Sequence, residues 1–293
     1  MLPRPPARLA GDLTTEATSI ASVDEAEAGA MTFCRGKGRR ARHAAQTSRA
    51  SIIFVEALPE EPPNDTRAWI QVDGARDAFG YLLDQLFSSE SEASIAAEAR
   101  IDSSAQIGEN VTIGPFSYIG ANAVLGKGTR VGRHVTVAAN CRIGRDVVIQ
   151  DGTVVGAEGQ GYYEGIDGGL YRFMHLGVVL VKDSVHIGAN CVVARGMLND
   201  TVIAERAKLA QGVVVGHNVV IGEGSFVGPS VTFCGSAKVG AGSTIGAGAT
   251  INNGVKVGGH ALVGIGSVVT KAVREHATVF GNPAGPLRST RSA

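Results

Sequence analysis

An apolar residue recurs at every sixth position over most of the chain between Ile101 and Val269. One run is unbroken from Ile101 to Val155 and another from Ile203 to Val269, and Gly or another small residue directly follows most of these positions. A period of six fits neither a lone helix, whose period is 3.6, nor a strand with two alternating faces. It is typical of a hexapeptide-repeat solenoid, in which short strands stack as parallel sheets. We therefore expect a mainly β protein with a left-handed parallel β-helix over residues 98–273.

The six-residue periodicity is interrupted twice, at residues 157–179 and 196–201. A solenoid expels insertions as loops on its surface, so both segments should be loops. The longer one is rich in Gly and Tyr and carries Tyr162 and His175, although aromatic residues make up only 5% of the chain. This enrichment favours ligand contact; a decorative insertion is the alternative.

The residues before the solenoid predict a small α/β domain over 21–97. Segment 22–33 is compatible with a short helix that leads into a strand, and 51–58 and 68–73 have the composition of strands. Residues 75–87 place apolar side chains at helical spacing and predict an amphipathic helix. We expect a disordered tail at 1–20 and an extended tail at 274–293.

Composition narrows the possible partners. Lys plus Arg equals Asp plus Glu at 27 each, so net charge gives no case for nucleic acid. The four Cys show no CxxC spacing, which favours reduced thiols in a cytoplasmic protein. No apolar run approaches 18 residues, so we expect no transmembrane segment.

Three segments within the solenoid, 177–203, 213–224 and 233–240, together resemble one family. It is the N-acyltransferase of lipid A biosynthesis, which acylates UDP-3-O-(3-hydroxyacyl)glucosamine. Segment 68–87 is similar to that family's sugar-nucleotide domain. The resemblance implies a homotrimer with active sites between neighbouring solenoids. It further implies a 3-hydroxyacyl carrier protein as thioester donor, a nucleotide-linked amino sugar as acceptor and no bound cofactor.

His217 is the leading catalytic candidate. It lies two residues beyond the core Val215, so it should project outward near a coil corner, where an imidazole can accept a proton at neutral pH. Gly235 stands eighteen residues later, one coil of three repeats, and its N–H could hold an oxyanion. The family match implies these roles of general base and oxyanion donor; a surface histidine is the alternative. We expect substrate to contact Phe33, Arg35, Arg39, Tyr162, His175, Asn218, Ser236 and Asn253.

The chain departs from the family pattern at several positions. Ala210 replaces an Asp seven residues before the histidine, and Gly254 stands where many members have a second histidine. Gly36 and Arg39 replace the Asn and Tyr that hold uracil. The basic run 35–43 that contains them could clamp phosphates or be a solvated face.

The expected function is therefore acyl transfer from a thioester to the 2-amino group of a UDP-linked glucosamine derivative, with His217 as base. The C-terminal segment resembles the end of acetyl-CoA-dependent sugar acetyltransferases, so coenzyme A is the alternative donor. A non-catalytic scaffold or binding protein is the alternative of another class. Some hexapeptide solenoids are zinc carbonic anhydrases, but no His pair here has their close spacing, so we expect no metal site.

Overall fold

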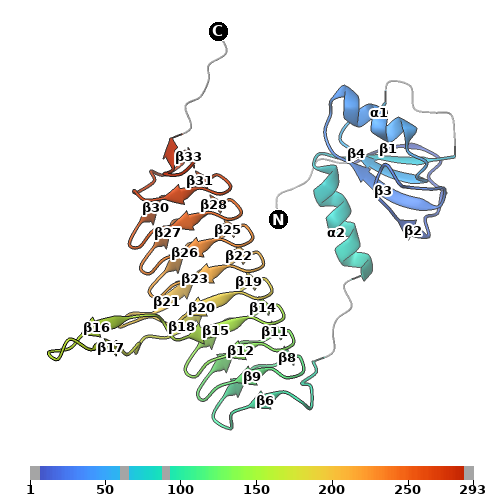
Figure 1. Ribbon diagram of the computed structural model, residues 1–293. Coiled ribbons are helices and arrows are strands. Elements are labelled where there is room, and N and C mark those ends of the chain that lie inside the picture. Colours follow the sequence, from blue (N-terminus) through green and yellow to red (C-terminus); the bar gives the residue numbers. More distant parts are fainter. Residues whose placement is uncertain (1–6, 60–65, 88–92, 287–293) are drawn as a thin grey trace. The chain divides into compact units, whose positions relative to one another are not determined.

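The computed structural model describes residues 7–59, 66–87 and 93–286. The chain divides into two compact units, Met1–Glu90 and Ser91–Ala293 (Figure 1).

The first unit is a five-stranded sheet in the order β1-β5-β4-β3-β2 with one helix on each face. Strands β2 to β5 run parallel, and β1 is antiparallel to β5 at one edge. Alternate residues of β4 separate the two cores: Ile53 packs with α1, and Phe54 packs with α2. The elements are β1 (Arg8–Gly11), β2 (Ser19–Ile20), β3 (Ala30–Cys34), α1 (Arg39–Thr47), β4 (Ile52–Val55), β5 (Ala68–Gln71) and α2 (Ala75–Phe87).

The sequence predicted part of this unit. Helix α2 has the expected bounds, and β4 and β5 lie within the expected strand segments. The structure differs at the N-terminus, where β1 pairs with β5 in a segment that we expected to be a tail. It also differs at 22–33, which turns into β3 without a helix. The second half of the basic run, for which we had no expectation of structure, begins α1 at Arg39. Both differences depend on packing against a sheet that periodicity alone does not reveal.

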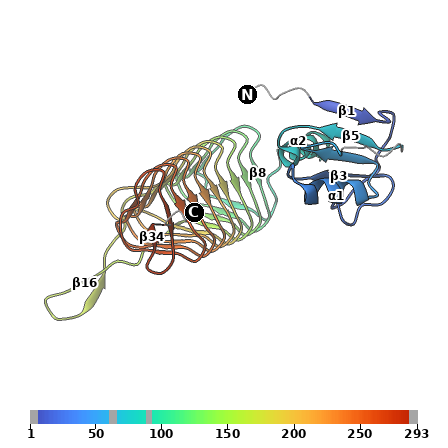
Figure 2. The same cartoon turned by 90° about the horizontal axis from the view of Figure 1, so that it is seen from above.

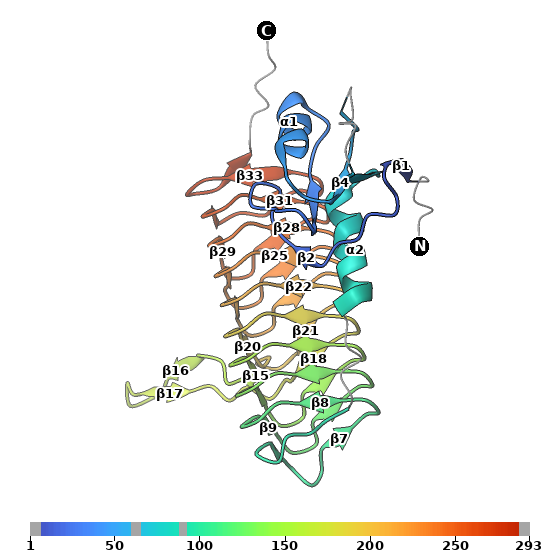
Figure 3. The ribbon, with the colours of Figure 1, turned by 90° about the vertical axis from the view of Figure 1, so that its right-hand side faces the viewer.

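The second unit is a solenoid of three sheets, which confirms the predicted β-helix (Figure 3). Their strands pair in parallel except at the last pair, β33 and β34, which is antiparallel. Each coil contributes one short strand to each sheet. Sheet I contains β7 (Gln106–Ile107), β10 (Val124–Leu125), β13 (Arg142–Ile143), β18 (Val179–Val181), β21 (Thr201–Ile203), β24 (Val220–Ile221), β27 (Lys238–Val239) and β30 (Lys256–Val257). Sheet II contains β8 (Thr112–Ile113), β11 (Arg130–Val131), β14 (Val148–Ile149), β19 (His186–Ile187), β22 (Lys208–Leu209), β25 (Phe226–Val227), β28 (Thr244–Ile245), β31 (Leu262–Val263), β33 (Thr278–Phe280) and β34 (Gly285–Pro286). Sheet III contains β6 (Arg100–Ile101), β9 (Tyr118–Ile119), β12 (Thr136–Val137), β15 (Val154–Ala157), β20 (Val192–Ala194), β23 (Val214–Val215), β26 (Thr232–Phe233), β29 (Thr250–Ile251) and β32 (Val268–Val269).

The apolar residues that recur at every sixth position form the solenoid core. Its members from Ile113 to Val269 are buried and stack on their copies in adjacent coils, as Ile221 stacks on Val239. A second inward position, two residues before each of them, holds a residue of equal or smaller size. Where that residue is Ser or Thr, its hydroxyl can donate to a carbonyl of the next coil, as Thr129 does to Gly144 at 2.8 Å. This bond satisfies a polar group that would otherwise be costly to bury.

The two interruptions are loops that leave the coil register intact. In a regular coil Leu125 pairs with Ile143, eighteen residues on, whereas Ile143 pairs with Val181 across the long loop. That loop contains the hairpin of β16 (Tyr162–Glu164) and β17 (Leu170–Arg172), which projects from the solenoid (Figure 2). The shorter slip lies between β20 and β21, and Val181 pairs with Ile203 across it.

The solenoid continues beyond the expected end at residue 273. Val263 pairs with Val279, sixteen residues on, so this coil is two residues shorter than a regular coil of eighteen. The loss of two residues interrupts the six-residue periodicity, but β31 and β33 still pair. For this reason the sequence predicted an extended tail where β33 forms.

Candidate active site

His217 and Asn218 are the two turn residues between β23 and β24. The turn forms because its second residue adopts a left-handed conformation, φ +60° for Asn218, which Asn tolerates better than most residues. Core residues on both sides anchor the turn, and the carbonyl of His217 accepts the Ser236 N–H at 2.7 Å. The imidazole is therefore held half-buried at a coil corner, as predicted from its offset from Val215.

Gly235 lies one coil later, directly against the imidazole. A Cβ atom on Gly235 would overlap Nε2 of His217, so the ring occupies the space that a side chain would need. Gly235 is buried, and none of the described residues accepts its N–H. The expected pair thus comes together, with a backbone donor beside a ring nitrogen.

The Asn218 side chain ties this turn to the short slip. Its Oδ1 accepts the N–H of Met197 at 3.1 Å and lies 3.0 Å from Nδ1 of His217. Its Nδ2 donates to the carbonyl of Asn199 at 2.5 Å. The amide is engaged by the chain itself, although we expected it to contact substrate.

His175 completes the cluster from the long loop. Its ring packs edge-on against the His217 ring, with centroids 5.4 Å apart and planes at 73°. It is 6% exposed, its Nδ1 lies 3.0 Å from the carbonyl of Phe173, and its Nε2 has no partner among the described residues. A Cβ on Gly159 would overlap this ring, so glycine lets the loop close over it. The loop histidine is therefore a buried neighbour of the candidate base.

The remaining expected residues fall into two groups. Ser236 follows Gly235 in its turn, and Asn253 stands exposed one coil beyond Gly235. Tyr162 lies on the projecting hairpin, where its hydroxyl donates to Gln160 at 3.2 Å. The others belong to the first unit: Phe33 packs against Phe79, whereas Arg35 and Arg39 are exposed.

The basic run lines a cavity of about 550 Å³ on the first unit, with Lys37, Arg39, Arg42, His43, Gln46 and Pro59 around it. Lys37 forms an exposed ion pair with Asp73, which raises the pKa of Lys37. Cationic groups around a cavity could bind phosphate, but part of this charge is neutralised within the unit.

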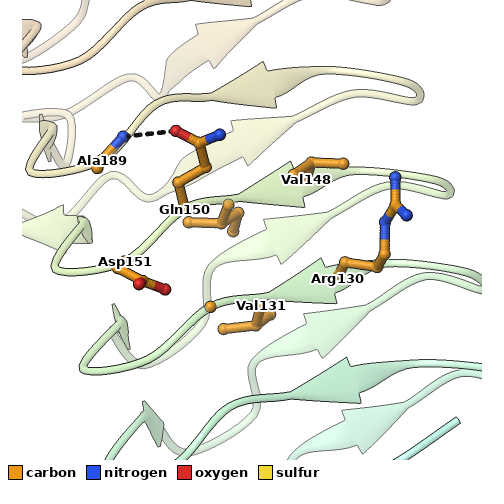
Figure 4. A pocket seen from close by; sticks show the side chains of 8 residues that line it. Arg130, Val131, Val148, Gln150, Asp151 and Ala189 are labelled. Atoms are coloured by element: carbon orange, nitrogen blue, oxygen red, sulfur yellow. Dashed lines mark hydrogen bonds between the residues drawn. The ribbon is translucent and has the colours of Figure 1, made fainter. Parts of the chain in front are cut away.

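The turn position of His217 and Gly235 binds oxygen atoms elsewhere in the solenoid. The N–H of Arg133 donates to Oδ1 of Asp151, one coil later, at 2.7 Å, and the N–H of Arg145 donates to Asp183 at 2.8 Å. In Figure 4 the Ala189 N–H donates to Oε1 of Gln150 at 3.1 Å, beside a cavity of about 380 Å³. The first N–H of a coil turn can therefore hold an oxyanion.

Two features of the site were not predicted from the sequence. The tie between Asn218 and the slip depends on backbone groups of Met197 and Asn199, which have no side-chain signature. The closure over His175 depends on Gly159, whose only signal was the glycine content of the loop. Among the described residues, no cluster of three His, Cys, Asp or Glu side chains could hold a metal ion.

Comparison with known proteins starts with the repeats. The family model for the bacterial transferase hexapeptide (six repeats) matches residues 104–139, 122–157 and 200–235. A second model, the hexapeptide repeat of succinyl-transferase, matches residues 236–271. The match to the first model ends at Gly235, and the match to the second model begins at the next residue.

Curated relatives point in the same direction as the resemblance drawn from the sequence. The UDP-3-O-acylglucosamine N-acyltransferase of Sinorhizobium fredii is 45% identical over 74 residues, 25% of this chain and 21% of the relative. The Helicobacter pylori enzyme of the same name is 38% identical over 88 residues, 30% of this chain and 26% of the relative. The chain is a divergent relative of these N-acyltransferases. The matches span about a quarter of the relatives' length or less.

Solved structures resemble the solenoid. LpxA from Acinetobacter baumannii superimposes with a TM-score of 0.60 at 25% identity, over 66% of this chain and 73% of that one. The UDP-N-acetylglucosamine acyltransferase of Bacteroides fragilis gives 0.60 at 26% identity, over 66% and 74%. The solenoid thus has the β-helix fold of these acyltransferase structures. Within the described residues, no helix has the length and hydrophobicity to span a bilayer.

Proposed function

We propose that this protein is an acyltransferase that moves an acyl group from a thioester to the 2-amino group of a nucleotide-linked amino sugar. The observation that carries the proposal is the contact between the His217 ring and Gly235 at a coil corner. The similarity to UDP-3-O-acylglucosamine N-acyltransferases supplies the acceptor class.

In the proposed step the amine nitrogen attacks the thioester carbonyl carbon. The C–N bond forms, the C–S bond breaks, and the products are an amide and a thiol. His217 takes the proton from the attacking nitrogen and returns it to the leaving sulfur, so the ring is neutral again at the end. A positioned base of this kind contributes about 10²- to 10⁴-fold in rate.

The Gly235 N–H would stabilise the oxyanion of the tetrahedral intermediate. The carboxylates held by Arg133 and Arg145 support this role, because each binds the equivalent backbone N–H of another turn in the solenoid. A single oxyanion donor typically contributes about 10²- to 10³-fold.

Apolar side chains beside the cluster favour a long acyl chain over acetyl. Met174 and Leu176 flank His175, and the N–H of Leu176 donates to the carbonyl of Met197, beside Leu198. All three apolar side chains are more than 60% exposed. Exposed apolar residues that neighbour the cluster residues in the sequence suit a hydrocarbon ligand, so we propose a 3-hydroxyacyl carrier protein as donor.

The outer face of sheet III supports assembly into a homotrimer. Its outward strand positions from β9 to β32 carry no charge: Tyr118, Thr136, Val154, Val192, Val214, Thr232, Thr250 and Val268. Depletion of charge is typical of the centre of an interface. His217 follows β23 of this sheet, so packing through it would bring the site close to a neighbouring copy. Sedimentation should give three times the 30.1 kDa chain mass; a monomer would contradict this assembly.

Donor competition read by mass spectrometry tests the function. The protein receives a UDP-linked 2-amino sugar with its 3-O-acyl group, a 3-hydroxyacyl carrier protein and acetyl-CoA. We expect the acceptor to gain the mass of the hydroxyacyl chain, and the gain to disappear with His217→Ala.

Two other outcomes would contradict the proposal in different ways. Acetyl gain alone would place the protein with the acetyl-CoA-dependent sugar acetyltransferases. No transfer from either donor, or transfer that survives His217→Ala, would remove the catalytic role of His217.

A further inference from the structure

The Asn218 amide is oriented by two backbone groups whose chemistry leaves no choice. A backbone N–H, that of Met197, meets one end of the amide, and a backbone carbonyl, that of Asn199, meets the other. An N–H can only donate and a carbonyl oxygen can only accept. The end that faces Met197 is therefore the oxygen, and it is this oxygen that lies 3.0 Å from Nδ1 of His217.

The orientation of the amide determines where His217 carries its proton. Because Oδ1 of Asn218 has no hydrogen to donate, the bond requires a proton on Nδ1 of the imidazole. In the neutral ring the other nitrogen, Nε2, then has the free lone pair. That nitrogen is the one that lies against Gly235.

We infer that Asn218 is a positioning residue that holds His217 in the Nδ1–H tautomer, and that the slip 196–201 holds Asn218 in turn. The inference deepens the proposed function and rests on it for its catalytic meaning. It assigns to an amide the task that a carboxylate orienting the base would perform, since Ala210 provides no carboxylate.

The slip at residues 196–201 therefore has a structural role, which is to hold the Asn218 side chain. In a regular turn the second residue bonds to the preceding coil through its backbone N–H, as Asn140 donates to the carbonyl of Ala121 at 2.9 Å. The additional residues between β20 and β21 bring Met197 and Asn199 to the two ends of the amide. Thr201 contributes a third bond, accepting the Asn218 N–H on its hydroxyl at 2.9 Å.

Nitrogen-15 NMR of the histidine rings tests the tautomer without any substrate. The His217 signals, assigned by their loss in His217→Gln, should show a protonated Nδ1 and an unprotonated Nε2 at a pH where the ring is neutral. Asn218→Asp keeps an acceptor for the Nδ1 proton but loses the donor to the Asn199 carbonyl, and it should keep this pattern because a carboxylate also attracts a protonated Nδ1. Asn218→Gly removes the acceptor, tolerates the positive φ and should move the proton to Nε2 or average it between the nitrogens.

Asn110→Gly is the matched control. Asn110 occupies the same left-handed turn position, with φ +56°, in a coil remote in sequence from the site. It should leave the His217 pattern unchanged. A proton on Nε2 in the wild-type protein would overturn the inference, and so would an unchanged pattern in Asn218→Gly.

Kinetics then separate positioning from folding. Asn218→Gly should lower kcat by about 10²-fold with KM unchanged, because the base presents the wrong nitrogen. Asn218→Asp should recover most of kcat and shift the acidic limb of the rate profile upward, because a carboxylate favours the imidazolium. His175, the titratable group that packs against the ring, is unaltered in every variant.

Failure of the inference differs from failure of the proposed function. The tautomer is measured without acyl transfer, so an Nδ1–H pattern in a protein inactive towards every donor would refute the function alone. An active protein in which Asn218→Gly keeps wild-type kcat would refute the positioning role alone.

Discussion

Two turns of the same solenoid use one backbone position in opposite ways. In the turn of Arg133 the first N–H is covered by the Asp151 carboxylate from the next coil, which also binds the guanidinium at 2.7 Å. In the turn of Gly235 the equivalent residue of the next coil is Asn253, and none of the described residues accepts the Gly235 N–H. The His217 imidazole of the preceding coil lies against Gly235. The comparison shows that the repeat supplies an oxygen-binding N–H at many corners, and that the corner beside the imidazole leaves this N–H available to a ligand.

The largest effect should come from restoring a side chain at Gly235. In Gly235→Ala the new Cβ overlaps the imidazole and displaces it. Activity should fall by about 10²-fold or more, because the base and the oxyanion donor lose their alignment. Steady-state kinetics measure the loss, and circular dichroism should show that the β-helix remains folded.

Gly259→Ala is the control for this change. Gly259 is also the first residue of its turn, and a Cβ there meets nothing closer than a carbonyl oxygen at 3.3 Å. It should leave the activity unchanged. If the two variants lost equal activity, the loss would come from the turn in general and not from the His217 contact.

A smaller effect should follow when the covered turn is imitated at the site. Asn253 stands one coil beyond Gly235, as Asp151 stands beyond Arg133. Asn253→Asp should bring a carboxylate onto the Gly235 N–H and compete with the oxyanion, lowering kcat by about 10-fold, part of what the donor contributes. Asn252→Asp adds the same charge at the preceding residue and should have little effect. Equal losses in both variants would indicate general repulsion by negative charge.

The sequence predicted the solenoid because its signal is local and repeated. Each core residue from Ile113 to Val269 is an apolar residue at a regular spacing, and each is buried. The two insertions are therefore visible as interruptions of that spacing. It also predicted that His217 and Gly235 meet, since equal positions of adjacent coils are eighteen residues apart.

The features that the sequence did not predict depend on partners far along the chain. Strand β1 exists because Arg8–Gly11 finds the free edge of β5, about sixty residues later. His175 is buried because glycine in its own loop leaves room for its ring. The orientation of Asn218 is set by backbone groups, which carry no residue-specific pattern. The hexapeptide periodicity therefore predicts the scaffold and the position of His217, whereas the groups that surround the His217 ring are set by tertiary contacts.

The smallest effect concerns the covered turns, which should contribute to stability and not to activity. The Arg145 N–H and guanidinium lower the pKa of the Asp183 carboxyl below its ordinary value of 3.8. Because that pKa is lower in the folded than in the unfolded protein, the contribution is complete above pH 3.8 and disappears as the pH falls through the folded value. Asp183→Asn keeps an oxygen for the N–H but loses this charge, so acid unfolding followed by circular dichroism should begin from a slightly lower stability at neutral pH and fall less steeply. The pair is exposed, so the difference should be below about 1 kcal/mol. Asp146→Asn removes the same charge from the residue next to Arg145, where the carboxylate forms no ion pair among the described residues. It should change the acid limb less than Asp183→Asn does, and kcat should remain at the wild-type value in both variants. A loss of activity in Asp183→Asn would mean that the covered and the open turns are not independent.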